Sequence, residues 1–545
     1  MISKKDLTGD IFGGITAAIV AIPLALAFGL QSGLGAIAGL YGAIALGIFA
    51  SLFGGTKTQI SGPTGPMTVV TAGVVITITE YYGSLDAAMG AILLTFVLAG
   101  IIQILMGVVG IGKYIRYVPY PVVSGFMSGI GVIIIILQIF PFFGLESPKK
   151  ILDILHSLHT IPEKINLQAM LLSLTTIAMI YLFPKVTKKI PPTLVALVVL
   201  TIASTILGLN VPIIGHIPEG LPEIRTEIFS SFDFDIVTII LVPAITLAAL
   251  GAIDSLLTSL VADNLTKTQH DSNKELVGQG IGNAVAGLIG GIPGAGATMR
   301  TVVNIKAGGR TQLSGVIHGV VLLIILLGAG EYAKLIPIPV LAGILITVGI
   351  GIIDYKGLKH IMHVPKADAA IMIIVLFVTV FVDLLQAVAV GMILAALLFM
   401  KNMSDLAESK SFSSLLEDLY HSKVLPDEKE IIEKFGKQVY IQHFEGPIFF
   451  GFTSYFKQLI QKLPDVKVVI FRMENVPFID QSGLYAIEDA LLSLQDKGIK
   501  VIFTGLQEQP KDLLTKVKLI PSLVKEDDIY ENFGEAVKAV STYLK

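Results

Sequence analysis

The sequence GIPGAGATMRTVV, residues 291–303, joins a glycine-rich loop to the start of a helix. It is one residue short of the phosphate-binding loop G-x-x-x-x-G-K-[ST], because Ala297 stands where the lysine should be. ATP binding is therefore not expected here. A helix N-terminus still attracts anions through its unpaired N–H groups. Gly294 and Gly296 allow close backbone approach, Thr298 adds a hydroxyl, and together they predict an anion site.

A second stretch, PTGPMTVV (63–70), has the same character. Pro66 suits the first turn of a helix, which Thr64 or Gly65 would cap. Short segments interrupted by glycine and proline, at matching places in two halves of a chain, indicate a transporter binding site. If the second half is inverted, the two helix starts converge near the middle of the membrane. The alternative is that both stretches are ordinary kinks and packing glycines.

The composition indicates a membrane protein. Of 545 residues, 53% are hydrophobic and 15% are charged, whereas soluble chains are about 25% charged. A membrane span needs roughly 20 apolar residues. Residues 1–401 therefore predict an all-α polytopic membrane domain of about 14 spans. The segments are 12–30, 33–54, 64–79, 88–111, 120–143, 168–184, 191–209, 236–256, 275–291, 297–305, 312–329, 337–353, 367–382 and 384–400.

Loop charges predict the orientation of these spans. With the N-terminus in the cytoplasm, the inward loops carry Lys113, Arg116, Lys306 and Arg310. This is the positive-inside pattern of a multi-pass inner-membrane protein. An even number of spans also leaves the C-terminus in the cytoplasm. Seven spans per half is an odd number, so the two halves are predicted to be inverted repeats.

The C-terminal part reads as a soluble domain. Residues 402–436 are polar and predict a linker, and residues 437–545 predict a cytoplasmic α/β domain. Its predicted strands are 438–444, 467–473 and 500–505, because these runs are rich in Val and Ile. Its predicted helices are 452–463 and 481–497.

An acidic residue, Asp254, lies well inside the eighth span. Such a residue is costly in a membrane and is a functional-site hypothesis by default. Thr258 lies four residues later on the same helix face. An aspartate and an anion in one low-dielectric pocket repel each other. Either a bound cation such as Na⁺, held by hard oxygen ligands, or a proton on Asp254 would relieve that repulsion. A structural aspartate, hydrogen-bonded between helices, is the alternative.

Several classes of function are not indicated. The chain has no cysteine, which excludes disulfides, thiol catalysis and cysteine-held metals. There is no basic cluster for nucleic acid and no convincing catalytic constellation, so we expect no enzyme activity and no cofactor besides the coupling ion. A membrane sensor that gates the C-terminal domain stays open as an alternative.

Two stretches resemble the sulfate permease (SulP) family of anion transporters: residues 37–70 and SNKELVGQGIGNAVAGLIGGIPGAGATMRTVVN (272–304). VPFIDQSGLYAIEDAL (476–491) resembles a STAS domain, the cytoplasmic module of that family. The stretch from residue 252 to 276, with its aspartate, is most similar to BicA-type, sodium-dependent bicarbonate transporters.

The resemblance implies a core domain of spans one to four and eight to eleven, and a gate domain of the other spans. It implies bicarbonate by Thr64, Ala297 and Thr298, with Asp254 beside it. It implies Na⁺ held by Asp254, Thr258, Gly296 and Thr298. Homodimers in lipid, with the core moving like an elevator against the gate, are also implied.

The STAS resemblance has one departure. Asp480 is followed by Gln481, where soluble relatives carry a phosphorylatable serine. A dimerising or scaffolding role for this domain is therefore expected. The whole sequence predicts a secondary transporter that imports bicarbonate by sodium symport. The alternative keeps the fold and carries sulfate, a dicarboxylate or chloride, driven by protons.

Overall fold

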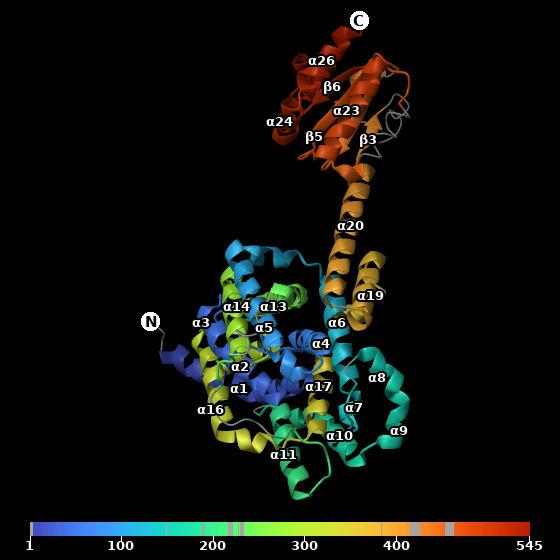
Figure 1. Ribbon diagram of the computed structural model, residues 1–545. Coiled ribbons are helices and arrows are strands. Elements are labelled where there is room, and N and C mark those ends of the chain that lie inside the picture. Colours follow the sequence, from blue (N-terminus) through green and yellow to red (C-terminus); the bar gives the residue numbers. More distant parts are fainter. Residues whose placement is uncertain are drawn as a thin grey trace. The chain divides into compact units, whose positions relative to one another are not determined.

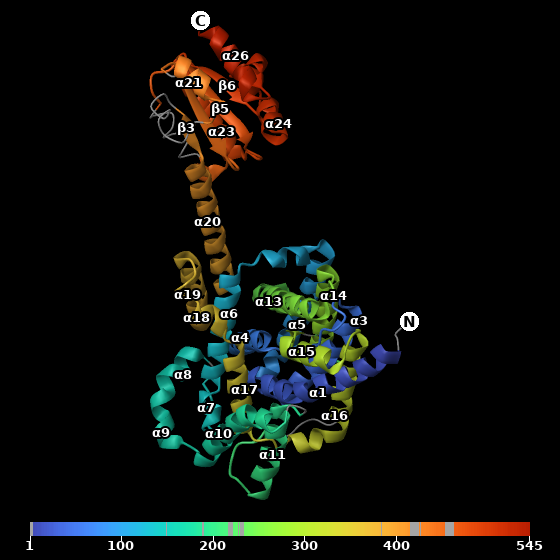
Figure 2. The ribbon, with the colours of Figure 1, turned by 180° about the vertical axis from the view of Figure 1, so that it is seen from behind.

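The computed structural model (Figures 1 and 2) divides into two compact units, residues 1–393 and 394–545. The structure describes residues 4–148, 150–187, 190–215, 222–226, 228, 234–382, 384–414, 425, 427–435, 437–452 and 463–544.

The first half of the helical unit begins with a long, continuous helix that contains Pro23. Its elements are α1 (Lys4–Gln31), α2 (Ala36–Ala45), η1 (Leu46–Ala50), α3 (Ser51–Phe53), β1 (Ser61–Gly62), α4 (Gly65–Tyr82), α5 (Leu85–Val109), η2 (Ile111–Tyr117), α6 (Tyr120–Leu137), α7 (Ile139–Phe142), α8 (Ile151–Ser157), η3 (Leu158–Thr160), α9 (Ile161–Lys164), α10 (Leu167–Leu182), η4 (Phe183–Lys185) and α11 (Pro192–Ile206).

The second half of the unit contains the longest helix among the described residues, α13. Its elements are α13 (Phe234–Thr266), α14 (Ser272–Leu288), β2 (Ala295–Gly296), α15 (Thr298–Ala307), α16 (Leu313–Ala333), α17 (Ile338–Ile352), α18 (Tyr355–Lys359), α19 (Lys366–Phe381) and α20 (Leu384–Lys410). Each of the fourteen apolar segments therefore contains a helix. Seven helices of the described residues are long and apolar enough to cross a membrane.

Short strands join the two halves of this unit. β1 pairs with β2 in antiparallel fashion, with Ser61 opposite Gly296 and Gly62 opposite Ala295. Helix α4 begins three residues after β1, and α15 begins two residues after β2. Because the paired strands run in opposite directions, the chain leaves the short ladder at opposite ends, and the two helices lead away from this shared point.

Small residues allow the helices around this point to pack closely. A methyl group at Gly100 of α5 would lie 2.5 Å from the backbone nitrogen of Ala284 on α14. One at Gly280 would lie 2.5 Å from the Gly100 carbonyl oxygen. Close backbone approach through small residues is typical of membrane helices. Helices α5, α13 and α14 pack together, and α6 packs with α17 and α19.

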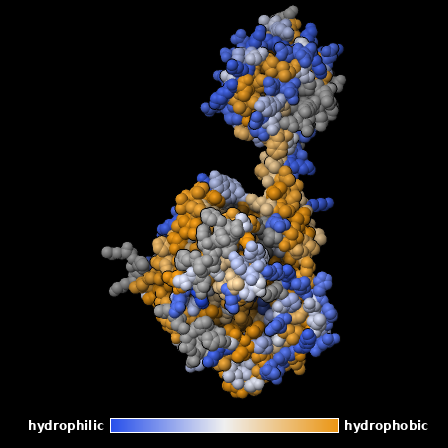
Figure 3. Space-filling view, in the orientation of Figure 1, coloured by the Kyte–Doolittle hydropathy of each residue, from blue (hydrophilic) through white to orange (hydrophobic). Residues whose placement is uncertain are grey.

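The hydropathy of the surface differs between the two units. In Figure 3 hydrophobic residues cover much of the visible face of the helical unit, and hydrophilic residues cover more of the C-terminal unit. Exposed apolar side chains of the helical unit include Val108, Val109 and Ile206, each more than 70% exposed. A lipid environment accounts for this exposure, because apolar side chains gain nothing by being buried away from lipid.

The C-terminal unit holds a five-stranded sheet in the order β3-β4-β5-β6-β7. Only β3 is antiparallel to its neighbour. Apolar clusters lie on both faces of the sheet, one around Phe471 and the other around Ile470. The elements are β3 (Phe412–Ser414), α21 (Lys429–Phe435), β4 (Val439–Glu445), η6 (Phe450–Phe452), β5 (Val468–Asn475), α23 (Gln481–Asp496), β6 (Lys500–Thr504), α24 (Glu508–Lys516), α25 (Leu519–Ser522), η7 (Glu526–Asp528), β7 (Ile529–Tyr530) and α26 (Phe533–Tyr543).

The polar stretch expected as a linker contains regular structure. Residues 402–410 continue α20, and β3 pairs with β4. The polar composition predicts a linker, but a helix that leaves the apolar region becomes polar without ending. Most of the helix predicted at 452–463 lies outside the described residues.

A charged hydrogen bond lies beside the central strand of this sheet, β5. Arg472 on β5 donates to Glu428, with 2.7 Å between Nη1 and Oε1. Burial alone would lower the pKa of Arg472, but this hydrogen bond and nearby carboxylates raise it. Arg472 also lies over the ring of Phe533, 4.4 Å from its centroid.

Candidate anion and cation site

Thr64 and Asp254 meet at the start of α4. The Thr64 hydroxyl donates to Asp254 Oδ2 at 2.7 Å, and both residues are buried. Thr64 is the N-cap residue of α4, yet its side chain makes no capping bond. Its hydroxyl is directed to α13 instead, so the first amides of α4 are left for another acceptor. The structure thus brings the predicted acid to the first of the two helix starts.

Thr258, Gly296 and Thr298 form a second group of contacts. The Thr258 hydroxyl donates to the Gly296 carbonyl at 2.9 Å and lies 2.7 Å from the Thr298 hydroxyl. Thr258 is fully buried, whereas Thr298 is exposed. Asp254 lies one helical turn from Thr258 on α13. Carboxylate, hydroxyl and carbonyl oxygens from α13, β2 and α15 are therefore gathered within a small volume.

Ala297 contributes through its position rather than its N–H. It is the N-cap residue of α15, and its amide donates to the Ile60 carbonyl at 2.8 Å. That N–H is therefore engaged and is not free for an anion. The amides of Thr298 and Met299 follow in the first turn of α15, where a helix leaves N–H groups without intrahelical acceptors. They are the donors that this helix end offers.

Arg300 is the third residue of α15. Its side chain is 2% exposed, and its Nη2 donates to the Pro63 carbonyl. It also lies close enough to Asp254 for their charges to interact. Nη1 has no partner within the described part of the chain. Arg300 therefore bridges the two broken segments, which are residues 55–66 around β1 and the start of α4, and residues 294–300 around β2 and the start of α15. It also partly balances the charge of Asp254.

An apolar cavity borders Asp254. Its walls come mainly from α6 and α13, and Pro66 of α4 closes one side. The lining residues are Pro66, Val118, Val122, Val123, Phe126, Met127, Leu250, Ile253, Asp254, Leu257 and Val388. Asp254 is the one polar residue among these lining residues.

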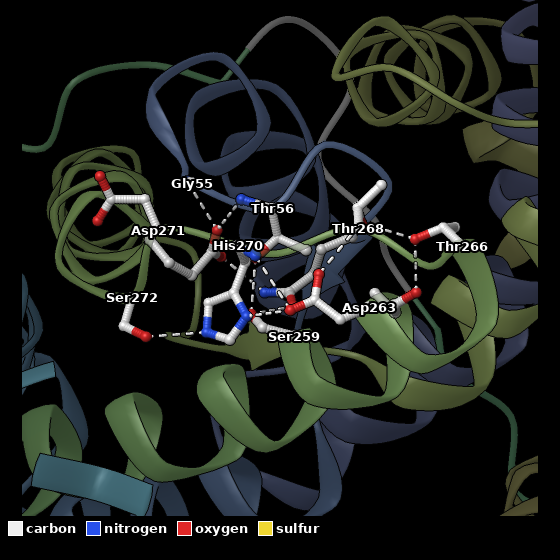
Figure 4. A network of polar contacts seen from close by, with 12 residues as sticks. Gly55, Thr56, Ser259, Asp263, Thr266, Thr268, His270, Asp271 and Ser272 are labelled. Atoms are coloured by element: carbon white, nitrogen blue, oxygen red, sulfur yellow. Dashed lines mark hydrogen bonds and ion pairs between the residues drawn. The ribbon is translucent and has the colours of Figure 1, made fainter. Parts of the chain in front are cut away.

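The loop after α13 is held by polar contacts (Figure 4). Asp263 Oδ2 accepts from His270 Nδ1 at 2.7 Å, and His270 Nε2 lies 2.9 Å from the Ser272 hydroxyl. Asp263 is the centre of these contacts, because its Oδ2 also accepts from the His270 amide at 3.0 Å. It lies within the last turns of α13 and fixes the following loop. Nearby, the Thr56 hydroxyl lies 2.7 Å from that of Ser259, which ties this region to the first broken segment.

Sequence reasoning missed several residues around these groups. Ser255 Oγ accepts from the Gly296 amide at 3.1 Å, next to Asp254 in the chain. Helix α14 adds three buried polar side chains, Glu275, Gln279 and Asn283. Their regular spacing of four residues inside an apolar span was the available signal. Among the described residues, no group of three or more His, Cys, Asp or Glu could hold a metal ion.

Comparisons with known proteins show the family to which the chain belongs. Residues 7–375 match the Sulfate permease family, and residues 431–536 match the STAS domain. The chain belongs to the sulfate permease family. It is 43% identical to the bicarbonate transporter BicA of Synechocystis sp., over 98% of this chain and 94% of that one. It is 33% identical to the putative sulfate transporter YvdB of Bacillus subtilis, over 95% of each chain.

Solved structures extend the likeness. The transmembrane domain of a cyanobacterium bicarbonate transporter, BicA, is 48% identical and covers 71% of this chain and 98% of its own, with a TM-score of 0.66. The murine Slc26a9 anion transporter in the inward-facing state is 18% identical and covers 99% of this chain and 92% of its own, with a TM-score of 0.84. The latter shows the fold alone. The protein is therefore a multi-span membrane transporter with a C-terminal STAS domain, rather than an enzyme.

In the STAS domain, Asp480 is the N-cap residue of α23. Its Oδ1 accepts from the Gly483 amide at 2.7 Å and its Oδ2 from the Phe450 amide at 3.2 Å. The motif aspartate thus has a structural role at a helix start. Such caps are typically worth about 1 kcal/mol.

Proposed function

We propose that the protein imports bicarbonate together with Na⁺. The observation that carries this is the joining of two broken helices beside Asp254, where one helix start offers amides to an anion and nearby oxygens suit a cation. The bicarbonate transporters named above, similar over nearly the whole chain, support the choice of cargo.

Charge balance supports symport. Asp254 and Arg300 carry opposite charges close together in the core of the unit. Adding an anion alone would leave one net negative charge in a low-dielectric site, which is costly. Adding Na⁺ with bicarbonate restores neutrality. We therefore assign Na⁺ to Asp254, Thr258, Gly296 and Thr298, and bicarbonate to the helix starts at Thr64, Ala297 and Thr298.

The movement proposed is of elevator type. The group of α5, α13 and α14 belongs to the proposed core, and the group of α6, α17 and α19 belongs to the proposed gate. The apolar cavity beside Asp254 lies where these groups face each other. A core that slides along the gate would carry the site across a bacterial inner membrane, with both chain termini in the cytoplasm and the chain as a homodimer.

Uptake of labelled bicarbonate into proteoliposomes tests the proposal, with and without an inward sodium gradient at fixed pH. We expect sodium to stimulate uptake strongly. Undiminished uptake without sodium would refute symport. The relatives named as sulfate transporters favour sulfate as the second candidate cargo. For this alternative we expect excess sulfate to inhibit the uptake of labelled bicarbonate. We also expect a proton gradient to drive uptake when no sodium gradient is present.

A further inference from the structure

Helix α14 carries a stripe of three buried polar side chains, Glu275, Gln279 and Asn283, which are 1%, 0% and 2% exposed. Their spacing of four residues puts them on one face of the helix. None of the contacts assigned to the anion or to Na⁺ involves them. Burying a carboxylate and two amides inside a membrane unit is costly unless each finds partners.

Glu275 binds the first broken segment with both of its oxygens. Oε2 accepts from the backbone amides of Gly55 at 2.9 Å and Thr56 at 2.8 Å. Oε1 accepts from the side-chain amides of Gln59 at 2.7 Å and Gln279 at 2.8 Å. Three of these four contacts join residues more than 200 positions apart in the sequence, so they are tertiary contacts rather than local turns.

The donors define the chemical state of Glu275. A carboxylate accepts about four hydrogen bonds, two at each oxygen, and all four donors here are N–H groups. A proton on either oxygen would face donors instead of an acceptor. No Lys or Arg of the described residues lies within ion-pair distance of Glu275. Amide dipoles alone therefore compensate this charge.

The other two residues of the stripe reach both segments. Gln279 Nε2 also donates to the Ser61 hydroxyl on β1 at 2.6 Å. Asn283 holds Gly294 on both sides, because its Oδ1 accepts from the Gly294 amide at 2.8 Å and its Nδ2 donates to the Gly294 carbonyl at 3.1 Å. Gly294 directly precedes β2, and Ser61 begins β1.

We propose that Glu275, Gln279 and Asn283 act as positioning residues that hold the two broken segments in the geometry required to bind the anion and Na⁺. This inference rests on the proposed function for its uptake assay. None of the three belongs to the proposed ligands of the anion or of Na⁺. Each acts through the loop that ends at Thr64 or through the turn that ends at Thr298. The stripe presets the site before any ligand arrives.

The network predicts an unusual response to a conservative change. Glu275→Gln keeps size and shape, but it places an NH₂ group against two N–H donors. Gln59→Glu alone sets two carboxylates against each other. In the double variant, the amide at 275 can donate to the carboxylate at 59, which restores the pair with its roles exchanged. Thr95→Val is the matched control, because Thr95 is equally buried but bonds only to Ala91 of its own helix.

The first measurement is uptake kinetics in proteoliposomes at equal amounts of folded protein. We expect either single variant to raise the apparent KM for bicarbonate by about 10-fold or more, since a charged hydrogen bond is lost. Maximal uptake should change less, and the double variant should recover most of the affinity. Thr95→Val should leave KM unchanged. Wild-type KM in Glu275→Gln, or loss of maximal uptake alone with no rescue, would overturn the inference.

The second measurement does not depend on the cargo. The natural chain has no cysteine, so spin labels can be placed at Lys57→Cys and Met299→Cys, two exposed positions on the two broken segments. We expect one narrow label-to-label distance distribution in the parent, a broad one in Glu275→Gln, and a narrow one again in the double variant. A narrow distribution in Glu275→Gln would refute the stripe's role, even if bicarbonate proved to be the wrong cargo.

Discussion

At the scale of single residues, Asp254 is the centre of the proposed coupling. Replacing it with asparagine removes the charge that Na⁺ would neutralise and leaves the buried Arg300 without its opposite charge. We expect sodium-dependent uptake by Asp254→Asn to fall to background and its thermal stability to drop. Uptake that still responds to sodium would contradict the assignment.

Thr258 tests the cation ligands separately. Thr258→Val removes the hydroxyl that bonds Gly296 and Thr298 and keeps the shape of the side chain. A single hydrogen bond is worth about 1 kcal/mol, so we expect the sodium concentration for half-maximal uptake to rise roughly 3- to 10-fold. Thr258→Ser keeps a hydroxyl and should stay near wild type. Sodium titrations of uptake in both variants compare them directly.

A site residue could be predicted only where the sequence around it carries a local signal of its role. Asp254 could be predicted because a charge inside an apolar span is visible in the sequence alone. Glu275 was not singled out, because it stands near the start of its span, where a charge suggests a solvated helix end. Its partners Gly55 and Gln59 are more than 200 residues away, and no local pattern encodes such pairing.

At the scale of elements, the pairing of β1 with β2 depends on a close approach of the two backbones. A methyl group at Gly294 would lie 2.2 Å from the Gly62 carbonyl oxygen. We therefore expect Gly294→Ala to force the strands apart, abolish uptake and lower the melting temperature in detergent. Gly73→Ala on α4 is the control, because a methyl there meets nothing within 4 Å. It should be neutral or stabilise by up to about 1 kcal/mol.

Elements whose ends are marked by glycine or proline were predicted closely. The short helices were expected to start near residues 64 and 297, and they begin at Gly65 and Thr298. Glycine and proline mark these starts because they alter backbone freedom locally. The two-residue strands could not be predicted, since their pairing depends on the partner segment. Residues 402–410 were expected in a linker, but helix α20 continues through them to Lys410.

At the scale of the whole molecule, the STAS domain is the proposed dimerisation element. Its sheet has apolar clusters on both faces, so the domain has a core of its own. We expect the full chain to be dimeric in detergent and a chain that lacks residues 436–545 to be monomeric, as measured by light scattering. A truncated chain that stays dimeric would place the interface in the helical unit instead.

The antiparallel ladder between the broken segments uses main-chain atoms alone. Side chains at positions 64, 297 and 298 can therefore be exchanged without breaking this ladder, although the contacts of the Thr64 and Thr298 hydroxyls with α13 are lost. A small library of variants at these three positions can therefore be made while the ladder stays unchanged. The variants can then be sorted by the oxyanion that they accept.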